Sequence, residues 1–239
     1  PGGQEIFRKL ARWADVLVEN FRPGVMDKLG IGYEDLKPLN PRLIYLSISG
    51  FGATGPYAQR PGFDQIAQGM SGLMSVSGDD STGPMRVGIA IGDLLAGLFG
   101  AKAVLAALIA RQYSGEGQEI RTSLLEALIG VLSWSAGIYF DTGKDPIPSG
   151  NHHPLLAPYG MFEASDGYIN IAAGNDHIWL RLCDALGLKE LAQDERFTNI
   201  PKRVENRGQL TEILNARLRE KTQKEWVESL NALGVPTGP

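Results

Sequence analysis

The sequence is short of residues that several classes of protein require. Its 239 residues include one cysteine, Cys183, so no disulfide can form within the chain, which fits a reducing compartment. We expect Cys183 to be a buried thiol, because it lies in an apolar helical segment. Lys and Arg (23) do not outnumber Asp and Glu (27), and the formal charge is −4. Bulk electrostatics therefore favour neither nucleic acid nor a membrane surface as a partner.

Long apolar runs are also lacking. The longest apolar segment, LLAGLFGAKAVLAALIA, is interrupted by Lys102 and rich in Gly and Ala, so we interpret it as a core helix rather than a membrane span. No secretory leader is visible. The chain opens on PGGQEIF and ends on GVPTGP, which we interpret as an incomplete chain. We expect a cytoplasmic protein, with the mitochondrial matrix left open.

Strand and helix signals alternate along residues 1–141. This alternation predicts an α/β fold with a Rossmann-like, mostly parallel sheet and helices. Strands are expected at 15–20, 42–49 and 118–124. Helices are expected near 4–14, 63–76 and 93–113, and a further helix should follow the third strand and run to about residue 140.

A Pro- and Gly-rich segment at 142–158 predicts a linker. After it, YGMFEASDGYINIAAG predicts a β-hairpin, followed by three helices near 176–187, 203–220 and 222–233. The sequence thus predicts a large α/β domain at 1–141 and a smaller α+β domain at 159–239.

GFGATG, at residues 50–55, matches G-x-G-x-x-G but does not predict a dinucleotide site. That fingerprint requires a helix directly after the third glycine, to hold the pyrophosphate. Pro56 and Tyr57 follow instead, and then QRPG, which favours extended or turning chain. We expect no nicotinamide cofactor, although the glycines suit a close approach of the backbone to some ligand.

Asp93 is a single carboxylate between two stretches of small and apolar residues, RVGIAIG and LLAGLFGA. Asp is a favoured N-cap, and a cap belongs in front of a long apolar helix. The same place also suits a nucleophile that attacks a carbonyl, with backbone N–H groups beside it to stabilise the oxyanion. Local chemistry leaves both interpretations open.

Five segments, in this order and spacing, resemble the class III CoA-transferases: VENFRPG, LGIGYEDLKPLNPRLIYLSISGFGATGPY, GFDQIAQGMSG, GIAIGDLLAGLFGAKAVLAALIAR and SGEGQEIRTSLLEA. That family includes formyl-CoA and carnitine CoA-transferases and shares its fold with α-methylacyl-CoA racemases. The resemblance covers nearly the whole chain. It implies transfer of CoA between carboxylic acids, CoA and acyl-CoA as substrates with no permanently bound cofactor, and a homodimer of interlocked subunits.

By this resemblance Asp93 is the catalytic aspartate, which forms an acyl-aspartyl anhydride and then an aspartyl-CoA thioester. CoA-binding candidates are Asn20, Phe21 and Arg22 in ENFRPG, Lys28, Arg60 and Phe63. An acidic chain must gather cations locally for the CoA phosphates. For each of these cations the alternative is a solvated surface charge, and for Phe21 a core position.

Two other functions stay open. A racemase needs two acid/base groups, and the related racemases have a histidine where this chain has Phe63, which cannot carry a proton. The third hypothesis is a non-catalytic CoA-binding fragment. His152 and His153 are expected to line the substrate site, and no metal is expected because a third ligand is missing. Asp176 is either a substrate-lining residue or the N-cap of the next helix.

Overall fold

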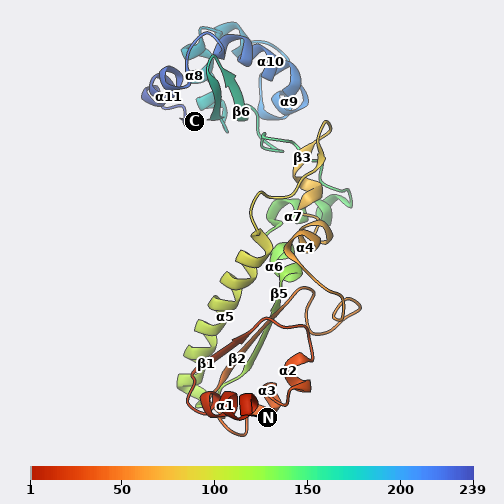
Figure 1. Cartoon of the computed structure of the whole chain (residues 1–239). Coiled ribbons are helices and arrows are strands. Elements are labelled where there is room, and N and C mark those ends of the chain that lie inside the picture. The colour runs from red at the N-terminus through yellow and green to blue at the C-terminus, as the bar shows by residue number, and fades with distance from the viewer. Residues whose placement is uncertain (1) are drawn as a thin grey trace. The chain divides into compact units, whose positions relative to one another are not determined.

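A computed structural model describes residues 2–239, and the chain divides into two compact units (Figure 1). The boundary lies between Pro146 and Ile147, inside the segment that the sequence assigned to a linker. The larger unit contains a parallel sheet with helices, and this confirms the predicted fold class.

Three strands form the parallel sheet of the larger unit in the order β1-β2-β5. They are β1 (Val16–Glu19), β2 (Ile44–Ser49) and β5 (Glu119–Ser123), and both neighbouring pairs are parallel. The central strand carries the buried side chains, as expected for a strand covered on both faces.

Two separate apolar clusters stabilise this unit. One joins α1 (Gly2–Ala11), α2 (Val25–Lys28) and α3 (Tyr33–Leu36) to the sheet. The other joins α4 (Asp64–Met70), α5 (Ile91–Ser114) and α6 (Leu124–Gly130).

The buried side of helix α5, which faces the sheet and helices α4 and α6, is a stripe of small residues: Gly92, Ala96, Gly100 and Ala107. A Cβ atom on Gly100 would lie 2.9 Å from Leu46 of β2, so glycine allows the close approach. Gly115, with φ +77°, ends the helix in the left-handed conformation that glycine readily adopts.

The expectation that no apolar run reaches the length of a membrane span is wrong for α5. The helix has 24 residues and a mean hydropathy of 1.8, enough by length and composition to cross a membrane, although core helices also meet that test. Lys102 does not interrupt it. Only 17% of the apolar window is buried within the described residues, because the face opposite the small-residue stripe is exposed.

Two predicted helices are interrupted. The helix expected at 63–76 ends before Gly72, whose φ of +86° turns the chain, and a 3₁₀ helix follows at Met74–Val76. The helix expected to reach residue 140 breaks into α6 and α7 (Ser133–Thr142), which are bent by 74°. A small hairpin, β3 (Gly78–Asp79) with β4 (Gly83–Pro84), was not predicted.

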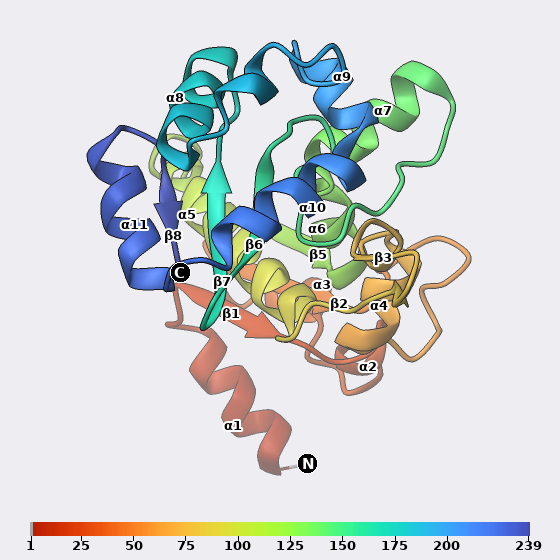
Figure 2. The ribbon, with the colours of Figure 1, turned by 90° about the horizontal axis from the view of Figure 1, so that it is seen from above.

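The smaller unit is built around the predicted hairpin, β6 (Tyr159–Ala164) with β7 (Gly167–Ala172), and β8 (Thr237–Gly238) extends it. Figure 2 shows α8, α10 and α11 around these strands. The helices are α8 (Asp176–Leu186), α9 (Ile200–Glu205), α10 (Arg207–Leu218) and α11 (Gln223–Ala232), with a 3₁₀ helix at Lys189–Ala192.

One continuous core holds this unit together, and Phe162, Trp179, Phe197 and Trp226 are among its large members. Cys183 is buried there, as predicted, and burial raises the pKa of its thiol to about 12. The helix expected at 203–220 is two helices, which meet at Asn206.

Candidate active site

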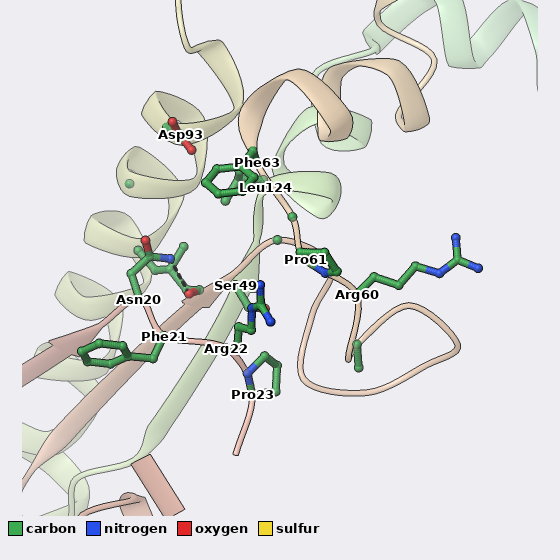
Figure 3. A pocket seen from close by; sticks show the side chains of 15 residues that line it. Asn20, Phe21, Arg22, Pro23, Ser49, Arg60, Pro61, Phe63, Asp93 and Leu124 are labelled. Atoms are coloured by element: carbon green, nitrogen blue, oxygen red, sulfur yellow. Dashed lines mark hydrogen bonds between the residues drawn. The ribbon is translucent and has the colours of Figure 1, made fainter. Parts of the chain in front are cut away.

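A cavity of 470 Å³ lies at the carboxyl ends of the parallel strands (Figure 3). Its walls come from the residues that directly follow β1, from Ser49 and Gly50 at the end of β2, and from Leu124 after β5. This edge of a parallel sheet is where open α/β folds bind ligands, because the loops there are free to vary. Asn20, Phe21, Arg22, Arg60, Phe63 and Asp93 all line this cavity.

Asp93 is not the cap of its helix. Helix α5 begins at Ile91 after Ala90, which places Asp93 third in the first turn, and the N-terminus has no side-chain cap of its own. The interpretation as a cap is therefore wrong. Within residues 2–239 the Asp93 carboxylate accepts no hydrogen bond, and Figure 3 shows it on the cavity side of α5, above Phe63.

The surroundings of Asp93 make its carboxylate more basic than usual. Partial burial raises its pKa, and the negative charge of Asp64 raises it further. A more basic carboxylate is a better nucleophile once it is ionised. The Asp93 carboxylate is thus accessible, accepts no hydrogen bond within residues 2–239, and is suited to attack an electrophilic carbon in the cavity.

The loop after β1 supplies four lining residues, Asn20 to Pro23, and a side chain anchors it. Asn20 donates from Nδ2 to the carbonyl oxygen of Ile48 at 2.6 Å, which ties the loop to the end of β2. Phe21 is 56% exposed, so the expectation that it could be a core residue is wrong. Its ring presents an open apolar face, and Arg22 adds a positive charge beside it.

The segment between β2 and α4 is closed at its neck by two glycines. A Cβ atom on Gly50 would lie 2.6 Å from the Cα of Gly62, so no other residue fits at either position without a backbone shift. The GFGATG glycines were expected to let the backbone approach a ligand. At Gly50 the glycine instead lets the backbone approach the backbone of Gly62. The sequence has a glycine at each end of this segment, but no local pattern predicts that Gly50 and Gly62 are in contact.

Within this segment the Arg60 guanidinium lies 4.1 Å from the centre of the Tyr57 ring. Tyr57 in turn packs edge-on against Phe51, with ring centres 6.2 Å apart. This contact holds a long cationic side chain at the edge of the cavity without neutralising it. Phe63, at the end of the segment, is 73% exposed.

Lys28 is the one CoA-binding candidate that the structure does not bring to the cavity. It is the last residue of α2 and is absent from the residues that line the walls. The position of a lysine at a helix end fits a solvated charge equally well.

His152 and His153 belong to the smaller unit. His152 packs edge-on against Phe162 and His153 packs against Tyr159, with ring centres 5.5 Å and 5.1 Å apart. Burial lowers the pKa of both imidazoles, and the charge of Arg207 lowers it further, so both are largely neutral at pH 7. Among residues 2–239 no group of three or more His, Cys, Asp or Glu side chains could hold a metal ion.

Asp176 is the first residue of α8 and not its cap. Asn175 is the N-cap, and its side chain accepts from the Ile178 amide at 2.9 Å. Asp176 accepts instead from Arg203 at 2.5 Å. Since the Arg203 side chain is fully buried and also donates to two backbone carbonyls, Asp176 has a structural partner.

Comparison with known proteins places the whole chain in one family. The profile of CoA-transferase family III matches residues 1–239. The chain is 43% identical over its full length to the acetyl-CoA:oxalate CoA-transferase of Acetobacter aceti, covering 61% of that protein. It is 40% identical to the succinate–glutarate CoA-transferase of Agrobacterium fabrum, covering 60% of it.

Solved structures agree with this similarity. A CAIB/BAIF family protein from Brucella suis superposes with a TM-score of 0.88 and 44% identity, covering all of this chain and 63% of that one. The chain therefore spans about three fifths of the length of the relatives that it matches.

Proposed function

Because the chain belongs to CoA-transferase family III, we propose that the protein of which it is part transfers CoA between carboxylic acids. The observation that carries this proposal is the position of Asp93. Its carboxylate accepts no hydrogen bond within the described residues, and it shares a cavity with an exposed aromatic ring and two arginines.

In the proposed reaction an Asp93 oxygen attacks the thioester carbon of the acyl-CoA donor, and the C–S bond breaks. The products are a mixed acyl-aspartyl anhydride and the CoA thiolate. The thiolate then attacks the Asp93 carbonyl carbon, which releases the donor acid and leaves an aspartyl-CoA thioester. The acceptor carboxylate attacks the aspartyl carbonyl carbon, which breaks the C–S bond, releases the CoA thiolate and forms a second mixed anhydride. The thiolate then attacks the acyl carbon of the acceptor in that anhydride, which gives the new acyl-CoA and frees the Asp93 carboxylate. No net proton, oxidant or reductant is needed.

The cavity supplies groups for each part of the CoA molecule. Arg22 and Arg60 are cations for its phosphates, and the open ring of Phe21 suits stacking of the adenine. The exposed Phe63 gives an apolar contact for the pantetheine or the acyl chain. We keep Lys28 as a weaker phosphate contact, because it does not line the cavity.

We propose dicarboxylates among the acids exchanged. The relatives are named for oxalate, succinate and glutarate, all of which carry a second carboxylate. Such a substrate needs a second cationic contact beyond those used for CoA. His152 and His153 of the smaller unit remain candidates to line the substrate site.

A homodimer is part of the same proposal. The exposed face of α5 carries large apolar side chains, among them Leu98 and Leu105, which are 66% and 63% exposed. Exposed apolar surface of this extent is typical of a face that another polypeptide covers. Sedimentation of the full-length protein as a monomer would contradict the dimer. We further propose a cytoplasmic location, which localisation of the tagged full-length protein would test.

The experiment is a transfer assay on the full-length protein with succinyl-CoA and a panel of mono- and dicarboxylic acids, with products identified by mass spectrometry. Hydroxylamine added during turnover should trap a hydroxamate on Asp93. Asp93→Asn should form neither product nor hydroxamate. Exchange of the α-proton of a branched acyl-CoA without any acyl transfer would favour the racemase alternative instead, although Phe63 supplies no acid/base group for it.

A further inference from the structure

The first turn of α5 is held by two polar side chains of a neighbouring helix. Asp64, the first residue of α4, accepts from the Gly92 amide through Oδ1 at 2.7 Å. Its other oxygen, Oδ2, accepts from Nε2 of Gln68 at 2.7 Å. Gln68 lies one turn further along α4 and is fully buried.

Gln68 extends this contact to the chain that leads into α5. Its Oε1 accepts from the Val87 amide at 2.9 Å, and its Nε2 also donates to the Ile89 carbonyl at 3.3 Å. The two side chains thus fix the backbone at three points immediately before Asp93. A buried amide with both of its ends bonded is costly to disturb, because each lost partner leaves an unsatisfied polar atom.

Asp64 takes the place of the cap that α5 lacks. Ala90 at the N-cap has no side chain to bond the free amides of the first turn, and Asp64 supplies the missing acceptor from another helix. Glycine at position 92 leaves room for this contact, since a Cβ atom there would lie 3.0 Å from both the Asp64 carboxylate and the Leu128 side chain.

We propose that Asp64, held by Gln68, is a positioning residue that caps α5 from outside and thereby fixes Asp93 at the cavity. This inference rests on the proposed function for its catalytic meaning, because it assigns how the nucleophile of that reaction is set in place. Asp64 itself need not touch CoA or the acyl group.

The charge of Asp64 adds a second effect. It raises the pKa of Asp93, after burial, because two like charges oppose ionisation. The elements packed against α5 bring few other charges. On α6, Glu126 accepts a hydrogen bond from Ser123, and on β5 Glu119 forms an ion pair with Arg121. Strand β2 contributes the titratable Tyr45. The arginines at positions 22 and 60 line the same cavity as Asp93.

A paired substitution separates positioning from charge. In Asp64→Asn combined with Gln68→Glu, the new amide at position 64 still accepts from Gly92 and donates to the new carboxylate at position 68. That carboxylate still accepts from Val87. The contacts to Gly92 and Val87 survive, the contact to the Ile89 carbonyl is lost because a carboxylate cannot donate, and the charge moves away from the partner of Gly92. Asp64→Ala removes the contact to Gly92, and Gln65→Glu, on an exposed position of the same helix, is the control for an added charge outside the network.

Two readouts that do not require turnover test the proposal on the full-length protein. Hydrogen exchange reports the Gly92 amide, and carbon-13 labelling of aspartate carboxyls reports the titration of Asp93, with its signal assigned by its loss in Asp93→Asn. We expect Asp64→Ala to speed exchange at Gly92 by about tenfold or more. We expect the paired variant to keep wild-type exchange and to shift the Asp93 titration to lower pH, because the like charge has left position 64.

The rate of hydroxamate formation should follow. It falls as pH drops through the Asp93 pKa, so its acid limb should move to lower pH in the paired variant and stay in place in Gln65→Glu. Unchanged Gly92 exchange in Asp64→Ala, or an unchanged Asp93 titration in the paired variant, would overturn the inference. If the wild type forms no hydroxamate while these NMR and exchange effects appear, the proposed function fails and the positioning role stands.

Discussion

The two units of the chain treat their tryptophans in opposite ways. In the smaller unit Trp179 and Trp226 are 1% and 2% exposed, whereas in the larger unit Trp13 and Trp134 are 75% and 53% exposed. The smaller unit has one continuous core, and the larger one has two modest clusters beside a cavity. The smaller unit thus buries its large aromatic side chains in one core, while the larger unit leaves two tryptophans and a cavity at its surface.

The largest effect that would sharpen this comparison concerns activity alone. Asp93→Asn in the full-length protein should lower CoA transfer by at least about a thousandfold, because a neutral amide cannot form the anhydride. The free energy of unfolding measured in urea should change by less than about 0.5 kcal/mol, since Asp93 is exposed and accepts no hydrogen bond within residues 2–239. CoA transfer retained in this variant would show that Asp93 of the larger unit is not needed for activity.

The next effect concerns stability alone. Trp226→Ala should destabilise the full-length protein by about 3–5 kcal/mol in urea unfolding, because it empties a core site and breaks the 2.6 Å bond from Nε1 to the Leu218 carbonyl. Trp13→Ala is the matched control in the larger unit, and its effect should stay within about 0.5 kcal/mol. Equal losses in the two variants would break the comparison.

Asp176 offers a smaller test of the same division. Asp176→Ala should cost about 1–3 kcal/mol of stability, because it leaves the buried Arg203 guanidinium without its carboxylate. If Asp176 acts only through Arg203, the KM values for both substrates should stay near wild type once unfolded protein is subtracted. A raised KM for the acid acceptor with unchanged stability would return Asp176 to the substrate site.

The smallest effect distinguishes two cations within the larger unit. Arg60→Ala should raise the KM for acyl-CoA by about tenfold with little change in kcat, because it removes one contact to the CoA phosphates. Lys28→Ala should change that KM by less than about twofold, since Lys28 does not line the cavity. The two variants assayed side by side show whether the cavity marks the CoA site.

Local patterns in the sequence predicted the elements well. The strand signals at 15–20, 42–49 and 118–124 correspond to β1, β2 and β5, and the ASDG turn corresponds to the β6–β7 hairpin. These succeed because apolar alternation and turn residues act over a few positions. The family resemblance supplied the candidates Asn20, Phe21, Arg22, Arg60, Phe63 and Asp93, which the structure gathers around one cavity.

The misses come from contacts between distant segments. Asp93 matched the pattern of a cap, but Asp64 caps the helix from 28 residues away, and no local rule could show that. Asp176 failed as a cap because its neighbour Asn175 already filled the role. The pairing of Gly50 with Gly62 likewise depends on two chain segments that meet only in the folded protein.

Oxygen exchange gives the most decisive test of whether Asp93 carries the transferred acyl group. The full-length protein is incubated with an acyl-CoA and with an acceptor acid whose carboxylate is labelled with oxygen-18. The mass of the peptide that contains Asp93 is then measured by mass spectrometry. The anhydride route predicts that oxygen-18 appears in the Asp93 carboxyl group, and only when both substrates are present. Labelled acyl-CoA product with an unlabelled Asp93 would show that the transfer does not pass through an anhydride on Asp93.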